Sequence, residues 1–156
     1  MQVEVVRSAR RKKTVQARLV SGVLKVSIPD HFSRAEEVDW VEKMAARYRS
    51  QALTDGFDLT ERALTLARRF ELPAPNSITW SDRQKTRWGS CTTDTATIRI
   101  SSLVANFPDW VLDYVIVHEL AHLVEANHSQ AFWALVDRYP RSDRARGYLV
   151  AKSDGR

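Results

Sequence analysis

Residues 118–122 read HELAH, in which two histidines stand four positions apart and a glutamate directly follows the first. On an α-helix, residues four apart lie about 40° from each other around the axis, one turn up. The imidazoles of His118 and His122 can therefore reach one metal ion, at roughly 2.0–2.1 Å for zinc. Glu119 lies too far round to be an equal ligand, but its carboxylate can hold a metal-bound water and take its proton. The pattern predicts a hydrolytic metal site.

A third ligand is expected from His128, which lies ten residues after His118. The spacing equals that of the metzincin signature H-E-x-x-H-x-x-G-x-x-H, but Glu125 stands at the position of its turning glycine. If the helix simply continued, His128 would stand roughly 9 Å above His122. The chain must therefore turn soon after His122, and Asn127, a residue type that tolerates the left-handed region, is the expected turning point. Glu125, on the metal-facing side, remains the alternative ligand.

Three protein ligands with an open fourth position are typical of catalytic zinc, whereas structural zinc usually has four ligands that include cysteine. The only cysteine, Cys91, could complete a structural site. Its place beside Trp88 in an apolar segment instead favours a small buried hydrophobic residue. The sequence therefore predicts Zn²⁺ held by His118, His122 and His128, with Glu119 as the catalytic residue.

The elements that position this site follow from hydrophobic periodicity. A helix is expected from about Pro108 through HELAH, and a second one over about 129–139. Strands are expected before them at 77–80, 87–91 and 97–100, giving a catalytic core over 77–139. Further upstream, residues 1–28 alternate as strands with a hairpin turn at Ser21-Gly22. Capping signatures at Ser33–Glu36 and Asp58–Glu61 predict helices to about residues 52 and 70. The whole predicts a single α+β domain over residues 1–156.

Composition excludes several other classes of protein. Of the 156 residues, 44% are hydrophobic and 28% are charged, as in globular domains, and no apolar stretch is long enough for a membrane span. The start lacks the apolar stretch of a secretory signal, and one cysteine cannot form an internal disulfide, so a cytoplasmic location is expected. The net charge of +5 is concentrated at residues 7–13, RSARRKK. Weak nucleic-acid contact is therefore possible, through a set of five cations: Arg7, Arg10, Arg11, Lys12 and Lys13.

The stretches RWGSC (87–91) and PDWVLDYVIVHELAHLVEANHSQAFW (108–133) resemble the YgjP-like metallopeptidases, relatives of the SprT-like and WLM zinc peptidases in the zincin clan. The resemblance extends more weakly to the basic N-terminal hairpin. It implies a zincin-like fold, zinc on His118, His122 and His128, Glu119 as general base, and a polypeptide substrate of unknown identity. The SprT-like and WLM relatives act on DNA-bound proteins, which supports a nucleic-acid link.

The resemblance also implies an extended peptide bound along an edge strand, expected at 96–101. Phe132 and Trp133 are expected to support His128. The residue that stabilises the oxyanion stays open among Tyr114, Tyr139, Arg87 and Tyr148. The alternatives to a peptidase are a nucleic-acid-associated module with a zinc-stabilised core and no turnover, and a degenerate scaffold, against which the intact Glu119 argues.

Overall fold

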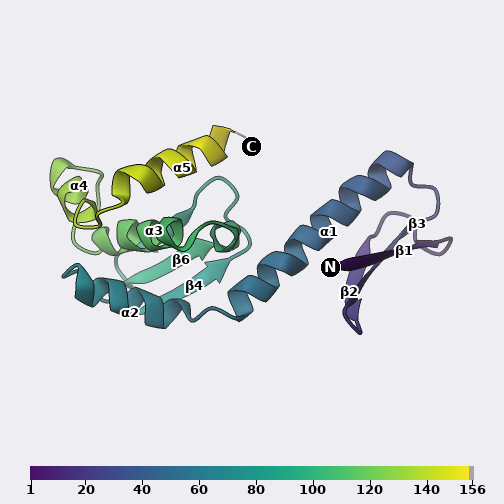
Figure 1. Cartoon of the computed structure of the whole chain (residues 1–156), viewed down its shortest axis with the longest axis horizontal. Helices are drawn as coiled ribbons and strands as arrows, with labels where there is room; N and C mark the ends of the chain where they lie inside the picture. The colour runs from purple at the N-terminus through teal and green to yellow at the C-terminus, as the bar shows by residue number, and fades with distance from the viewer. Residues whose placement is uncertain (155–156) are drawn as a thin grey trace. The chain divides into compact units, whose positions relative to one another are not determined.

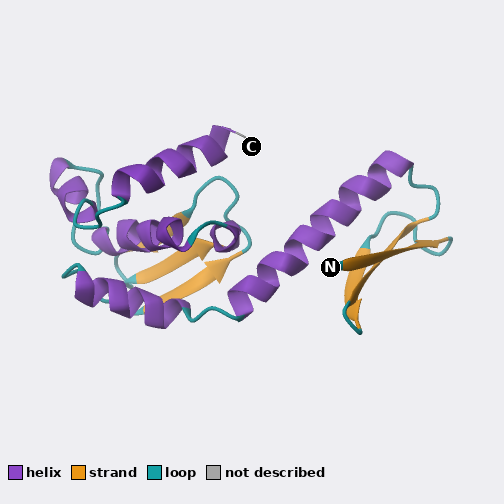
Figure 2. Cartoon of the chain, viewed as in Figure 1, coloured by secondary structure: helices purple, strands orange, loops and turns teal. Residues whose placement is uncertain are grey.

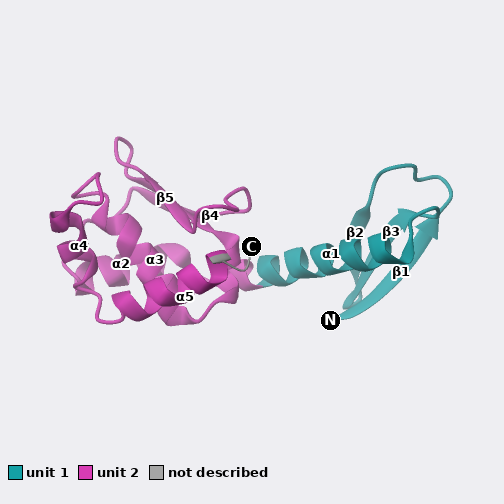
Figure 3. Cartoon of the chain, turned by 90° about the horizontal axis from the view of Figure 1, so that it is seen from above, with its two compact units in different colours: residues 1–52 teal, residues 53–156 magenta. Residues whose placement is uncertain are grey.

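The structure is a computed structural model that describes residues 1–154 (Figure 1). The chain divides into two compact units, residues 1–52 and the chain from Leu53 onward, which Figure 3 shows in separate colours. The single domain over 1–156 stays a prediction, because compactness alone does not show whether one unit folds without the other. Every helix within residues 1–154 is too short or too polar to cross a lipid bilayer.

Helices and strands both contribute to the chain, as the α+β prediction requires (Figure 2). In chain order they are β1 (Gln2–Ser8), β2 (Gln16–Val20), β3 (Val23–Pro29), α1 (Arg34–Asp55), α2 (Leu59–Arg69), β4 (Ser77–Ser81), β5 (Gly89–Thr92), β6 (Thr97–Ser101), the 3₁₀ helix η1 (Ser102–Asn106), α3 (Asp109–Ala121), α4 (Gln130–Val136) and α5 (Ser142–Asp154).

The first unit contains a three-stranded sheet and all but the last three residues of α1. Strand β3 is central, parallel to β1 and antiparallel to β2. The β2–β3 hairpin turns on Ser21 and Gly22, both with positive φ, as the sequence predicts. Leu24, Val26 and Ile28 of β3 are fully buried and pack with the apolar face of α1. Alternation along β3 therefore decides which face of the sheet the helix covers.

Helix α1 begins with the predicted capping box. The Glu36 backbone N–H donates to Ser33 Oγ at 3.1 Å, and the Ser33 N–H donates to the Glu36 carboxylate at 2.7 Å. Arg7, at the end of β1, fixes the entry to this helix: its guanidinium donates to the carbonyl oxygens of Asp30 (2.9 Å) and Phe32 (2.6 Å). Arg7 is therefore a structural cation.

In the second unit, β6 is the central strand of a three-stranded sheet, parallel to β4 and antiparallel to β5. Helix α3 is buried over most of its length, from Val111 to Val117. It is tied to α2 by Arg62, whose guanidinium donates two 2.7 Å hydrogen bonds to the Asp113 carboxylate. That pairing satisfies Asp113, which is 9% exposed, among the buried residues of α3 from Val111 to Val117.

Candidate metal centre

Helix α3 carries His118 and Glu119 on its last turn and ends at Ala121, which makes His122 its C-cap. The turn after it uses the last carbonyl groups of the helix: the N–H groups of Val124 and Glu125 both donate to Ala121 O at 3.0 Å. The expected left-handed turn at Asn127 is wrong, since Asn127 is not among the residues with positive φ in the described range 1–154. Short-range backbone hydrogen bonds satisfy the helix end, so the turn needs no left-handed residue.

This turn brings His128 back to the two helical histidines. One ligating atom from each of His118, His122 and His128 lies within 4.8 Å of the others, and the two Nε2 atoms of His122 and His128 are 3.1 Å apart. Two nitrogens that ligate a tetrahedral zinc at roughly 2.05 Å would be ~3.3 Å apart. The His122–His128 pair therefore has the spacing of two zinc ligands, and His118 completes a group of three imidazoles that could hold the ion.

The protonation of the histidines also fits metal binding. His122 Nδ1 lies 3.1 Å from the Glu125 carbonyl oxygen, which can only accept, so Nδ1 carries the proton and Nε2 presents its lone pair to the site. Burial, followed by the neighbouring His122 and His128, lowers the pKa of His118 to about 3. Burial is also the main cause of a lowered pKa at His122. Both rings are thus neutral near pH 7, the form that binds metals.

The start of α4 holds the histidines from behind, as the sequence predicts. Phe132 is fully buried and stacks on His122, with ring centroids 4.4 Å apart at 24°. Trp133 stacks on His128, with centroids 5.7 Å apart at 26°. Ser129 Oγ accepts the Phe132 N–H at 3.2 Å and so begins α4 directly after His128.

Glu119 is the buried carboxylate of the site. It is 5% exposed, and its Oε2 lies out of contact with water and without a hydrogen-bond partner among the described residues. Burial raises the pKa of Glu119 to about 7, against the opposing effect of Arg87. A buried carboxylate oxygen without a partner is costly and needs an explanation beyond packing. Such an orphaned oxygen beside three imidazoles fits a centre that holds a cation and a water.

Two other predicted candidates do not join the histidine group. Within residues 1–154, the His/Cys/Asp/Glu group able to share a metal consists of the three histidines and leaves out both Glu125 and Cys91. Glu125 contributes its carbonyl oxygen to His122 instead. Burial, followed by the charge of Glu119, raises the pKa of Cys91 to about 11, which keeps its sulfur a thiol and a poor ligand.

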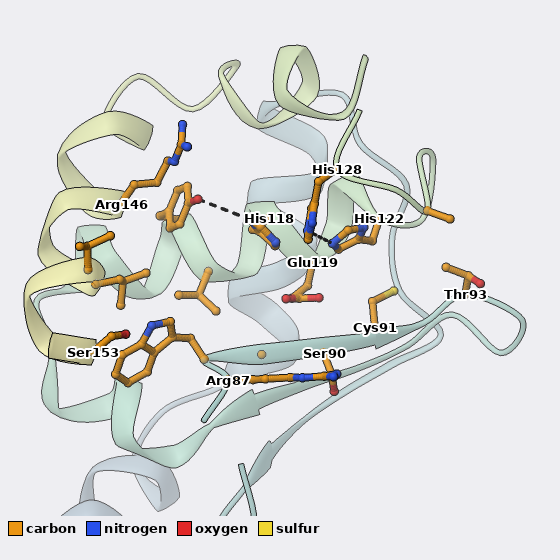
Figure 4. Close-up of a pocket in the computed structure, with 17 residues that line it drawn as sticks. Arg87, Ser90, Cys91, Thr93, His118, Glu119, His122, His128, Arg146 and Ser153 are labelled. Carbon is orange, nitrogen blue, oxygen red and sulfur yellow. Dashed lines mark hydrogen bonds between the residues drawn. The ribbon is translucent and has the colours of Figure 1, made fainter. Parts of the chain in front are cut away.

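The histidines and Glu119 line a cavity of about 890 Å³ between β5 and α5 (Figure 4). Helix α5, which the sequence analysis missed, contributes Arg146, Leu149, Val150 and Ser153 to its lining. The signal that could have found this helix is Ala145 and Leu149, four positions apart and both buried. The many arginines and Gly147 obscure that apolar stripe.

The edge strand beside the site is β5. The sequence analysis expected the peptide-binding edge at 96–101, but β6 occupies these residues and is paired on both sides, so that expectation is wrong. Among the strands within residues 1–154, β5 pairs only with β6, so its other edge keeps backbone donors and acceptors for an added strand. Ser90 and Cys91 of β5 line the cavity.

The four candidates for stabilising the oxyanion differ in whether their side chains line the cavity. Tyr114 and Arg87 line the cavity, and burial as the main cause raises the pKa of Tyr114 to about 12, so its hydroxyl keeps its proton. Tyr139 instead donates from its hydroxyl to Trp110 O at 2.7 Å. Tyr148 packs edge-on against Phe107 and is absent from the cavity lining. Of the four, Tyr114 and Arg87 are therefore the two that line the cavity.

The family description "YgjP-like, metallopeptidase domain" matches residues 30–149. Two solved structures have a similar fold. The metallopeptidase zymogen of Pyrococcus abyssi abylysin is 21% identical, with a TM-score of 0.53, over 59% of this chain and 91% of that one. The metallopeptidase zymogen of Methanocaldococcus jannaschii jannalysin is 22% identical, with a TM-score of 0.51, over 62% and 97%. They confirm the predicted zincin-like fold. Among proteins of curated function, none matches the chain significantly.

Gly89 leaves the space that the Glu119 carboxylate occupies. A Cβ at position 89 would lie 3.1 Å from both Cγ and Oε1 of Glu119. We expect Gly89→Ala to lower the free energy of unfolding by about 1–3 kcal/mol, as over-packing does, and to do so far less in a Glu119→Ala background. Chemical denaturation of the four proteins measures this coupling.

The matched control is Gly147→Ala. A Cβ at Gly147 meets nothing within 4 Å, and alanine favours the interior of α5, so this change should raise stability by ~0.5–1 kcal/mol. An equal loss from Gly89→Ala with and without the Glu119 side chain would show that the carboxylate is not what fills the space. The backbone contact at 3.2 Å, to Arg99 O, would then be the cause.

Proposed function

The chain belongs to the YgjP-like metallopeptidase family, and from this premise we propose that His118, His122 and His128 hold its zinc and that Glu119 is the general base of peptide hydrolysis. The chain is a metallopeptidase, and its substrates are polypeptides. The observation that carries the residue assignment is the convergence of three imidazoles beside a buried carboxylate in one cavity. A scaffold without turnover would have no use for that carboxylate.

Zinc, when bound, supplies Lewis acidity that polarises a scissile carbonyl and acidifies water. The chain's own contribution begins with Glu119, whose carboxylate takes a proton from the attacking water and passes it to the leaving amine. Its burial suits this exchange, because a pKa of about 7 lets the group both accept and release a proton near neutral pH. The hydroxyl of Tyr114 and the guanidinium of Arg87 are the donors proposed for the developing oxyanion.

Substrate orientation is assigned to β5. An extended peptide that pairs with the free edge of β5 would run along the cavity lined by Ser90 and Cys91, past Glu119. Main-chain hydrogen bonds would give such binding little dependence on sequence. Side chains of the cavity lining would then supply the selectivity.

Metal retention tests the ligand assignment. We expect the protein to co-purify with one equivalent of zinc and His122→Ala to lose most of it, because two ligands hold zinc poorly. The control is His31→Ala, which removes the one histidine outside the cluster, an exposed residue of the first unit. Elemental analysis of the three proteins gives the result, and unchanged zinc in His122→Ala would refute the ligand set.

Glu119→Gln should separate metal binding from chemistry. The amide keeps the shape of the side chain but cannot take a proton, so we expect full zinc content and at least a 10²-fold loss of peptide hydrolysis, the lower limit for a removed general base. Cleavage of unfolded casein, followed by release of fluorescent fragments, provides the assay. Wild-type turnover in this variant would eliminate Glu119 as the base.

We also propose weak, sequence-independent contact with nucleic acid, and the supporting observation is the loop between β1 and β2. Arg10, Lys12 and Lys13 are exposed there. Arg7 is held by backbone carbonyls, and Arg11 bonds Thr14 and Gln16, so the five cations expected from the sequence reduce to three. The expected kinship with SprT-like and WLM peptidases stays a prediction.

We also propose a cytoplasmic location for the protein. The single cysteine, which cannot form an internal disulfide, supports this proposal.

Three phosphate contacts set the salt dependence. Binding of a labelled DNA duplex should fall with a log–log slope no steeper than about −2.7, at ~0.9 per neutralised phosphate, and should be lost near physiological salt. Fluorescence anisotropy at several salt concentrations measures this slope. The triple variant Arg10→Gln, Lys12→Gln, Lys13→Gln should abolish binding, whereas glutamine at Lys43, Arg47 and Arg49 of α1 should not. Equal loss in both triple variants would remove the loop from the proposal.

A further inference from the structure

Arg146 places a cation in the wall of the cavity. It projects from α5, and the cavity that holds the three histidines and Glu119 counts Arg146 among its lining residues (Figure 4). The charged side chains of Arg87 and Glu119 share that lining. Because Glu119 is almost fully buried, the solvent-facing charge of the described lining is positive.

An aromatic ring holds this guanidinium in place. Its central carbon lies 4.2 Å from the centroid of the Trp133 ring, and Trp133 in turn stacks on His128. The cation–π contact occupies one face of the guanidinium and leaves its N–H groups at the edge. Arg146 is thus fixed one ring away from the histidine cluster.

Neighbouring carboxylates leave Arg146 largely available. Its Nη1 lies 3.8 Å from Asp143 Oδ1, beyond hydrogen-bond distance, and the Asp143 side chain is 96% exposed. Exposed ion pairs of this kind contribute little. A ligand carboxylate could therefore displace Asp143 at small cost.

We propose that Arg146 is a specificity residue, which binds a carboxylate of the polypeptide substrate and so selects acidic substrates. This inference rests on the proposed peptidase function. A guanidinium offers paired N–H donors that match the two oxygens of a carboxylate, and it has no acceptor for an amide or ammonium group. Arg87, in the same lining, further disfavours cationic side chains. The carboxylate can come from an Asp or Glu side chain or from the C-terminus of the peptide.

The test uses the full zinc-loaded chain and a quenched fluorogenic Ala-Gly peptide in which one glutamate or glutamine is moved position by position. Each peptide is made with a C-terminal acid and with a C-terminal amide. We expect a preference of about tenfold, expressed mainly in KM, for a carboxylate at one position, as for a hydrogen bond to a charged group. If the preference follows Glu over Gln, the side chain is the source, and if it follows acid over amide, the C-terminus is.

Arg146→Gln should remove that preference while keeping one equivalent of zinc, and Arg146→Glu should reverse it toward a lysine peptide. The matched control is Arg144→Gln on the same helix. Arg144 also stacks on a tryptophan, with its guanidinium carbon 5.0 Å from the Trp110 ring, but it is absent from the cavity lining. This control should keep the wild-type preference.

A binding measurement makes the result independent of turnover. In the Glu119→Gln background, the anisotropy of the labelled preferred peptide should report the same dependence on Arg146. If this dependence persists while the wild-type protein cleaves no peptide, the peptidase proposal fails and the anion subsite stands. The inference is overturned if Arg146→Gln weakens the binding of acidic and neutral peptides equally. It is also overturned if Arg144→Gln reduces the preference for acidic peptides as much as Arg146→Gln does.

Discussion

Burial of the Glu119 carboxylate is the constraint on which the rest of the second unit depends. Helix α3 is apolar over most of its circumference, so a glutamate on its last turn must lie inside the core. An ionised carboxylate there carries a desolvation cost that packing contacts do not offset. The structure accommodates it by leaving position 89 without a side chain, where a Cβ would lie 3.1 Å from both Cγ and Oε1 of Glu119. The buried carboxylate therefore lowers the stability of the fold, and rigid neighbouring residues must keep the site in place.

That framework is aromatic. His118, His122 and His128 each lie against the ring of Phe132, with centroid distances of 5.0, 4.4 and 5.0 Å. Because Phe132 is fully buried, it cannot move without opening the core, and its position fixes the three imidazoles relative to one another. The chain connects these rings through a short turn and the capped start of α4, so the third histidine is positioned by local structure.

The sequence predicts what depends on near neighbours and misses what depends on distant ones. The capping box at Ser33, the N-cap at Asp58, the hairpin at Ser21-Gly22 and the helix through HELAH follow from local chemistry and are confirmed. The position of 96–101 in its sheet is not local, because β6 pairs on one side with β5 and on the other, in parallel, with β4, which comes earlier in the chain. Helix α5 was missed because only a narrow stripe, Ala145 and Leu149, faces the core.

The difference between local and distant contacts also explains why a net charge of +5 says little about which ligands the protein binds. Arg7 and Arg138 donate to backbone carbonyls, and Arg62 is bonded to Asp113, so these guanidinium groups hold the fold together. Tertiary contacts such as these cannot be read from composition. A cation that is held by an aromatic ring differs, because the ring orients the guanidinium without consuming its hydrogen-bond donors. Arg146 on Trp133 is such a cation in the cavity lining, which is why its charge can act on a substrate while those of Arg7, Arg62 and Arg138 cannot.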